Sequence, residues 1–148
     1  MDKKSLAQLL FLSILLLLQA CRPIPETRYL AEAEIPTREH GNQVEAVIRK
    51  LALESGLRFW SKPREEMDII KSLMPIREPF IHVLFLEDDP LLTVTNVPPG
   101  DTLSVALAGN YKWREEQLQQ LETQVVEALT AIGFELDEIN RSLSENGG

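Results

Sequence analysis

Apolar and polar residues alternate from residue 29 to residue 35. The apolar members of this pattern are Tyr29, Ala31, Ala33 and Ile35. Successive side chains of a strand point to opposite faces of a sheet, so the alternation predicts a strand with one buried face. A second, short strand is expected over residues 58–60, which read Arg-Phe-Trp.

Three further strand-like runs lie between residues 80 and 107. Residues 80–86 are apolar on both faces, whereas residues 91–97 and 103–107 alternate. An acidic turn at 87–90 separates the first two runs, and Pro-Pro-Gly-Asp at 98–101 separates the last two. The three runs therefore predict an antiparallel meander.

Apolar residues at helical spacing predict two main helices. The first contains Val44, Ile48 and Leu51; it starts either at Thr37 or at a capping pair of Asn42 and Glu45. It ends where Gly56 can take the left-handed conformation that closes a helix. The second is expected to be the longest in the chain, from about residue 113 to residue 132.

The segment from residue 61 to residue 79 leaves two interpretations open. Met67, Ile70 and Met74 can form one face of a short helix, and a mobile loop is the alternative. If both main helices cover one sheet face, apolar residues of 80–86 on the other face need a cover. We favour this segment as the cover over a second copy or a partner. Trp60, with the three apolar residues of the segment, defines a possible interaction surface.

The order of these elements indicates the fold class. Two strand–helix–strand units predict an α+β domain, with a largely antiparallel sheet and two main helices on one face. A relation to the ferredoxin-like plan is open. We expect a single domain over residues 29–138. Residues 139–148 are polar and small, which is typical of a disordered tail.

The N-terminal segment has the pattern of a signal peptide. Lys3 and Lys4 precede an uncharged apolar block at residues 9–18. A membrane-spanning helix needs about 20 apolar residues, so this block is too short to span. It ends at Cys21, the single cysteine of the chain, in the sequence Leu18-Gln19-Ala20-Cys21.

Residues 18–21 resemble the lipobox of bacterial lipoproteins, which has an aliphatic residue, a small residue two places later and then the cysteine. Gln19 stands where that class prefers a small or β-branched residue. The resemblance implies that residues 1–20 are removed, and that Cys21 carries a diacylglyceryl group and an acyl chain such as palmitate. Residues 21–28 then form the lipidated cysteine and its tether. Cleavage by ordinary signal peptidase, or an uncleaved anchor, with Cys21 incidental in either case, is the alternative.

The lipoprotein resemblance also implies a location. In bacteria with two membranes, an aspartate after the cysteine retains a lipoprotein in the inner membrane, and this chain has Arg22 there. We therefore expect an outer-membrane lipoprotein whose domain faces the periplasm. Two or three acyl chains suffice for stable anchoring.

The net negative charge of the chain narrows the classes of molecule that the domain is expected to bind. The chain has 15 basic and 23 acidic side chains, and loss of Asp2, Lys3 and Lys4 with the leader leaves 13 and 22. Such an acidic domain is not expected to bind nucleic acid or anionic lipid headgroups. The lipid on Cys21 must then supply the attachment to the membrane.

Residues that could carry chemistry are few. His82 falls among apolar strand residues and is expected to be a core histidine, while His40 is expected to be solvated. The carboxylates at 87–89 fit a solvated turn better than a calcium loop, and those at 65–68 fit the first turn of a helix. We expect no catalytic residues, metal or cofactor.

These observations favour a non-enzymatic, lipid-anchored envelope protein whose small domain binds another envelope protein. Two alternatives remain. One is a small-ligand or lipid-binding module with a pocket between sheet and helix. The other is an immunity lipoprotein that neutralises a toxin, which fits the acidic charge and the compartment.

Overall fold

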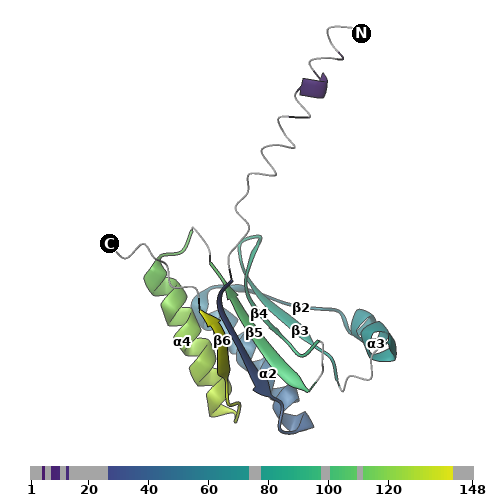
Figure 1. Cartoon of the computed structure of the whole chain (residues 1–148), viewed down its shortest axis with the longest axis vertical. Helices are drawn as coiled ribbons and strands as arrows, with labels where there is room; N and C mark the ends of the chain where they lie inside the picture. The colour runs from purple at the N-terminus through teal and green to yellow at the C-terminus, as the bar shows by residue number, and fades with distance from the viewer. Residues whose placement is uncertain are drawn as a thin grey trace.

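A computed structural model describes residues 27–73, 78–97, 101–109 and 112–141, together with Ser5, residues 8–10 and Ser13. The domain contains six strands and three helices within these ranges (Figure 1). In chain order they are β1 (Thr27–Glu34), α2 (Arg38–Ser55), β2 (Arg58–Ser61), α3 (Arg64–Leu73), β3 (Ile81–Leu86), β4 (Asp89–Thr95), β5 (Thr102–Ala108), α4 (Glu115–Ala131) and β6 (Asp137–Arg141).

The strands form one antiparallel sheet in the order β2-β3-β4-β5-β1-β6. Helices α2 and α4 lie side by side on one face of it (Figure 1). The predicted α+β class, with a largely antiparallel sheet and two main helices on one face, is therefore confirmed. Strands β5 and β6 run in the same direction with β1 between them, which is the split strand–helix–strand unit of the ferredoxin-like plan. The β3–β4 hairpin widens the sheet between β2 and β5.

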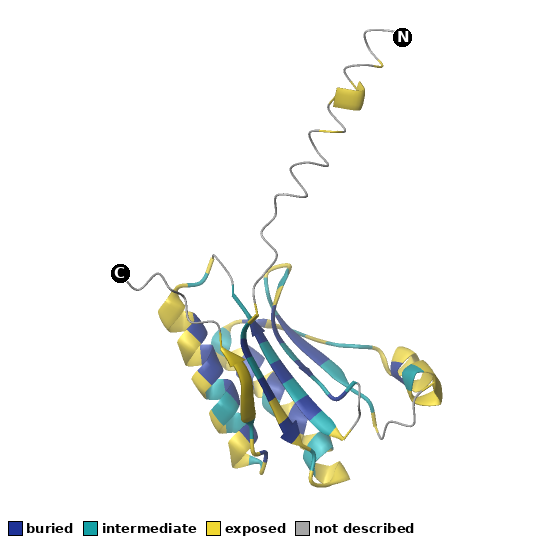
Figure 2. Cartoon of the chain, in the orientation of Figure 1, coloured by how far each residue is buried: buried dark blue, intermediate teal, exposed yellow. Residues whose placement is uncertain are grey.

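The core lies between the sheet and the two main helices (Figure 2). One row across its helix-facing side runs through Phe59, Leu84, Leu92, Leu107 and Tyr29. The residues that meet the sheet from the helices are Val44, Ile48 and Leu51 of α2 and Leu118, Leu121, Val125 and Leu129 of α4. The expected strand alternation and helical stripes are thus what buries this core.

The first main helix begins one turn earlier than the pair Asn42 and Glu45 suggested. Thr37 is the N-cap of α2, and its backbone is extended, with φ −145° and ψ 162°. The capping interpretation of Asn42 and Glu45 is wrong, because both residues lie inside the helix. Gly56 closes α2 in the left-handed region, at φ 68°, as predicted. At 18 residues α2 also exceeds α4, which has 17, so α4 is not the longest helix.

The last strand lies where a disordered tail was expected. β6 extends to Arg141 and pairs with β1, so the predicted tail boundary at residue 139 is wrong. The sheet also extends to Thr27, two residues before the predicted domain start. All five residues of β6 are exposed, and no apolar alternation marks it in the sequence. Pairing along an edge needs only backbone groups, which explains why the pattern of side chains did not reveal the strand.

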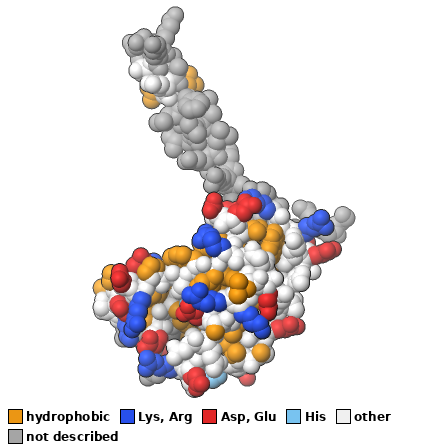
Figure 3. Space-filling view, turned by 180° about the vertical axis from the view of Figure 1, so that it is seen from behind, with side chains coloured by type: hydrophobic (Ala, Val, Ile, Leu, Met, Phe, Trp, Pro, Cys, Tyr) orange, Lys and Arg blue, Asp and Glu red, His pale blue; other side chains and the backbone are white. Residues whose placement is uncertain are grey.

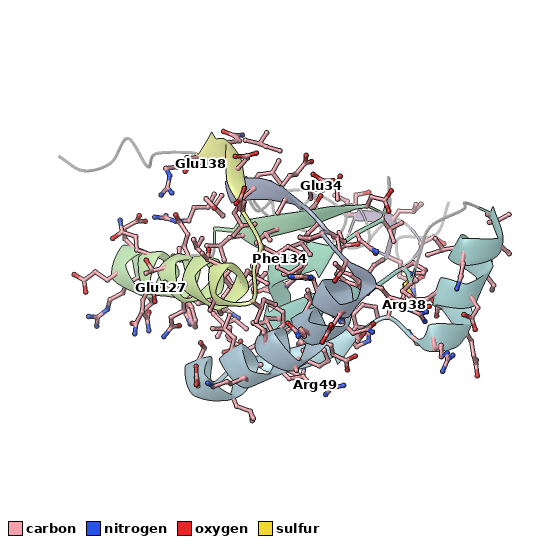
Figure 4. The ribbon with its side chains drawn as sticks, turned by 90° about the horizontal axis from the view of Figure 1, so that it is seen from below. Glu34, Arg38, Arg49, Glu127, Phe134 and Glu138 are labelled. Carbon is pink, nitrogen blue, oxygen red and sulfur yellow. The ribbon has the colours of Figure 1, made fainter. Side chains whose placement is uncertain are left out.

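The segment after β2 contains a helix, as one of the two interpretations predicted. α3 stands beside the sheet, beyond the end of β2, and does not lie over the open face (Figures 1 and 4). The expectation that this segment covers the open face is therefore wrong. Ile81 and Phe85 remain half-buried on that face, and the guanidinium of Arg58 lies 4.4 Å from the centre of the Phe85 ring.

Candidate functional site

The described residues of the predicted interaction surface differ in how far they are exposed. Trp60 is 38% exposed on the edge strand β2, and Ile70 is half-buried on α3. Met67 is only 5% exposed, so its assignment to a surface is wrong. Met74 lies outside the described residues.

Two neighbours of these residues are the most exposed apolar groups of α3. Ile69 is 60% exposed and Leu73 is 78% exposed. They lie four residues apart, so their side chains share one face of the helix. The sequence indicates that some apolar residues of α3 are exposed, because its apolar arc is wider than one buried contact requires. This arc contains Met67, Ile69, Ile70 and Leu73. We call Trp60, Ile69, Ile70 and Leu73 the α3 edge.

Charged pairs surround the α3 edge. Lys62 Nζ lies 2.9 Å from Glu66 at the start of α3, and Arg38 of α2 lies 2.7 Å from Glu78 just beyond the segment. All four carry exposed or partly exposed charge, so each pair contributes little to the free energy of folding. They place charges of both signs on the elements next to α3.

His82 is buried in the core, as predicted. It is 4% exposed, and its ring stacks on Phe80 with 5.0 Å between ring centres. Burial lowers its pKa to about 4; nearby Glu45 raises the pKa and Arg49 lowers it by smaller amounts. Its Nδ1 lies 3.0 Å from Ser61 Oγ on the neighbouring strand. A base with so low a pKa is a poor proton acceptor at neutral pH, so we read the pair as a contact that orients the buried ring.

His40 is a packing residue and not the solvated one that the sequence suggested. Its Nδ1 lies 2.7 Å from Thr37 Oγ1, and its ring meets the edge of Phe134 at 6.0 Å between centres. Phe134 itself lies between α4 and the sheet (Figure 4). The histidine thus connects the start of α2 with the turn that follows α4.

A polar groove lies between the end of α2 and the first half of α4. Its cavity has a volume of about 190 Å³. The lining residues are Glu54, Ser55, Trp113, Gln117, Gln120, Leu121 and Gln124. We call this cavity the helix groove. Sequence reasoning did not single it out, because glutamines on a helix normally indicate only a solvated face. A smaller cavity of about 70 Å³ lies at the start of α2.

Leu18, Gln19, Ala20 and Cys21, the residues that resemble a lipobox, lie outside the described residues. The structure does place Thr27, where the tether expected from the sequence would join the domain. Thr27 begins β1, six residues after Cys21, and strand directions define what lies at that end of the sheet. β2 runs parallel to β1, so the end of α2 and the helix groove lie at the Thr27 end, whereas α3 follows the opposite end of β2.

Surface charge, possible metal ligands and helix hydropathy add three findings. Acidic and basic side chains are interspersed on the helix side of the molecule (Figure 3). Across the described ranges, no cluster of three or more His, Cys, Asp or Glu residues could hold a metal ion. In the same ranges, no helix is both long enough and apolar enough to cross a membrane.

Comparison with known proteins identifies no family. No family model and no curated protein matches the chain. Among solved structures, an adenosylmethionine decarboxylase from Aquifex aeolicus is similar to this chain, with a TM-score of 0.45 and 8% sequence identity. The alignment covers 83% of this chain and 98% of that one. At this level of similarity we transfer neither activity nor site residues.

Proposed function

We propose that this chain is a lipid-anchored cell-envelope protein whose small, non-enzymatic domain binds another envelope protein. The anchor is the lipid on Cys21, and the binding surface is the α3 edge. The observation that carries the binding surface is the exposure of Ile69 and Leu73, at 60% and 78%, on one face of a helix outside the main core.

The tether supports this proposal by its length. Six residues from Cys21 to Thr27 reach at most about 20 Å, so the Thr27 end of the domain stays close to the membrane. The α3 edge follows the opposite end of β2, so it lies at the end of the domain farther from the point of attachment at Thr27. A partner in the periplasm can reach that end of the domain without displacing the anchor. We propose the outer membrane as the location, because Arg22 and not an aspartate follows Cys21.

The composition of the α3 edge suits a protein partner. Interfaces are enriched in aromatic residues and have an apolar centre with a charged rim. Trp60 supplies the aromatic group, Ile69 and Leu73 supply the apolar centre, and the pairs of Lys62 with Glu66 and Arg38 with Glu78 supply the rim. The open sheet face beside Trp60, with half-buried Ile81 and Phe85, can extend the contact.

Site-specific photocrosslinking in intact cells tests the binding surface. A photoreactive phenylalanine analogue at Leu73 should form a discrete crosslinked species with one envelope protein. The same analogue at Leu53, an 85% exposed leucine on α2, is the matched control and should form none. Crosslinks of equal yield at both positions, or none at Leu73 or Ile69 in cells that express the protein, would contradict the proposal.

A further inference from the structure

The helix groove has a mostly polar lining. Side chains facing the space between two packed helices are normally apolar, because they pack against the partner helix. Here Gln117, Gln120 and Gln124 project from α4 at spacings of three and four residues, so they share one face. Glu54 and Ser55, from the last turn of α2, stand opposite them.

Much of the hydrogen-bonding capacity of this lining is unused by the described protein groups. Gln117 accepts a bond from the Arg114 backbone N–H at 3.0 Å through Oε1, which leaves its Nε2 donors available. Gln124 Oε1 accepts a long bond of 3.4 Å from Ser55 Oγ, which likewise leaves Nε2 available. No described residue bonds to the Gln120 amide. The groove therefore presents amide donors from α4 facing the carboxylate and hydroxyl oxygens of α2.

Two lining residues are apolar, so the groove has an apolar part beside its polar part. Trp113 and Leu121 both pack against the domain core and contribute surface to the cavity. Trp113 is half-buried, so its ring is held in place by the core while part of it remains accessible. An aromatic ring beside convergent amides suits a ligand with one apolar face and a hydroxylated rim.

Charge and size limit the ligand class further. The lining contains no Lys or Arg among described residues, and the carboxylate of Glu54 lies 3.8 Å from Lys50 Nζ of the same helix. The lining itself therefore offers no positive charge to an anionic ligand. The volume of about 190 Å³ is smaller than the ~300 Å³ lower bound of drug-sized pockets, so the groove suits an occupant of about one ring.

We propose that the helix groove is a binding site for one ring of a neutral saccharide. The ring packs its C–H face on Trp113, and its hydroxyl groups bond to the glutamines of α4 and to Glu54 and Ser55. The site lies at the Thr27 end of the domain, separate from the α3 edge, so this proposal does not depend on a protein partner.

Tryptophan fluorescence of the purified full-length chain tests the site. The chain has two tryptophans, so Trp60→Phe leaves Trp113 as the single reporter. A detergent without a sugar headgroup is required, because a glycoside detergent would compete. Glucose and N-acetylglucosamine should each give a saturable change, with a Kd of about 1–10 mM expected from a few net hydrogen bonds of about 1 kcal/mol each.

Matched variants locate the response. Gln120→Ala, in the Trp60→Phe background, should weaken saccharide binding about threefold to tenfold, the effect of losing one hydrogen bond. Gln119→Ala removes the adjacent glutamine, which lies outside the groove and bonds to Glu115 at 3.4 Å, and should change the Kd less than twofold. Equal effects of the two variants would overturn the assignment.

Other ligands and glycan polymers complete the test. Absence of a saturable response to either sugar, or tighter binding of putrescine or inorganic phosphate, would overturn the proposal. Sedimentation of the chain with insoluble cell-wall glycan, reversed by free N-acetylglucosamine and weakened in Gln120→Ala, would identify the polymer as the source of the ring. Binding of the monosaccharides without sedimentation would identify free sugar as the ligand. Both outcomes support a saccharide site, and neither affects crosslinking at Leu73.

Discussion

The guanidinium of Arg141 on β6 lies 2.5 Å from the carboxylate of Glu122 on α4. Glu122 is nearly buried, and Arg141 also bonds to Glu138 on its own strand at 2.9 Å and lies 5.4 Å from the centre of the Tyr29 ring. The bond to Glu138 and the interactions with Glu122 raise the pKa of Arg141, so it stays charged. This cluster joins β6, whose five residues are all exposed, to the helix layer.

Removal of Arg141 should therefore destabilise the domain. Arg141→Ala leaves Glu122 without its countercharge, and we expect a loss of about 1–2 kcal/mol in the free energy of unfolding, reduced from the buried-pair value because Arg141 is partly exposed. Urea denaturation measures it. Glu122→Gln in the same background should restore part of the loss. Full stability of Arg141→Ala would show that the cluster does not hold β6.

A second prediction concerns the two glycines that follow the main helices. Gly133 has φ 104°, and a Cβ there would lie 2.8 Å from His40 Nε2. Gly133→Ala should cost about 2 kcal/mol, from backbone strain and from displacement of the histidine. Gly56→Ala is the matched control: φ is 68°, but nothing lies within 4 Å of the added atom, so about 1 kcal/mol is expected. Thermal and urea unfolding measure which of the two variants loses more stability. A larger loss in Gly56→Ala than in Gly133→Ala would contradict the close approach of His40.

The buried His82 predicts how stability depends on pH. Its folded-state pKa of about 4 lies below its ordinary value of 6.5, so the unfolded chain binds the proton more readily in this interval. The contribution of His82 to the free energy of unfolding is then nearly full above about pH 6.5, and it is lost as the pH falls toward 4. Between pH 7 and pH 5 the loss should be about 2 kcal/mol.

Variants assign this pH dependence to His82. In His82→Gln, most of the loss of about 2 kcal/mol between pH 7 and pH 5 should disappear. In His40→Gln, where His82 is intact, the loss should equal that of the parent chain. Urea unfolding at several pH values measures each. An unchanged slope in His82→Gln would show that His82 is not the group responsible.

Local pattern predicted most of the fold because the residues that bury the core also set its elements. Tyr29, Ala31 and Ala33 mark β1 by alternation, and Gly56 marks the end of α2 by its conformation. Of the two starts that the sequence left open for α2, Thr37 is the N-cap, whereas Asn42 and Glu45 have the residue types and spacing of a cap but lie inside the helix.

The candidate sites were less predictable, for a physical reason. Met67 and Leu73 are both apolar positions of one short helix, and sequence cannot tell which one faces the domain. The glutamines of the helix groove acquire meaning only when the last turn of α2 lies opposite them. Both features arise from contacts between segments far apart in the chain.

The chemical state of Cys21 tests the central claim most directly. Mass spectrometry of the protein isolated from cells should show a mature chain that begins at Cys21 and carries diacylglyceryl and acyl groups. Cys21→Ser should keep residues 1–20 and take up no labelled fatty acid. A native chain that retains residues 1–20, or that has a free Cys21 thiol, would contradict the account of this protein as a lipid-anchored envelope protein.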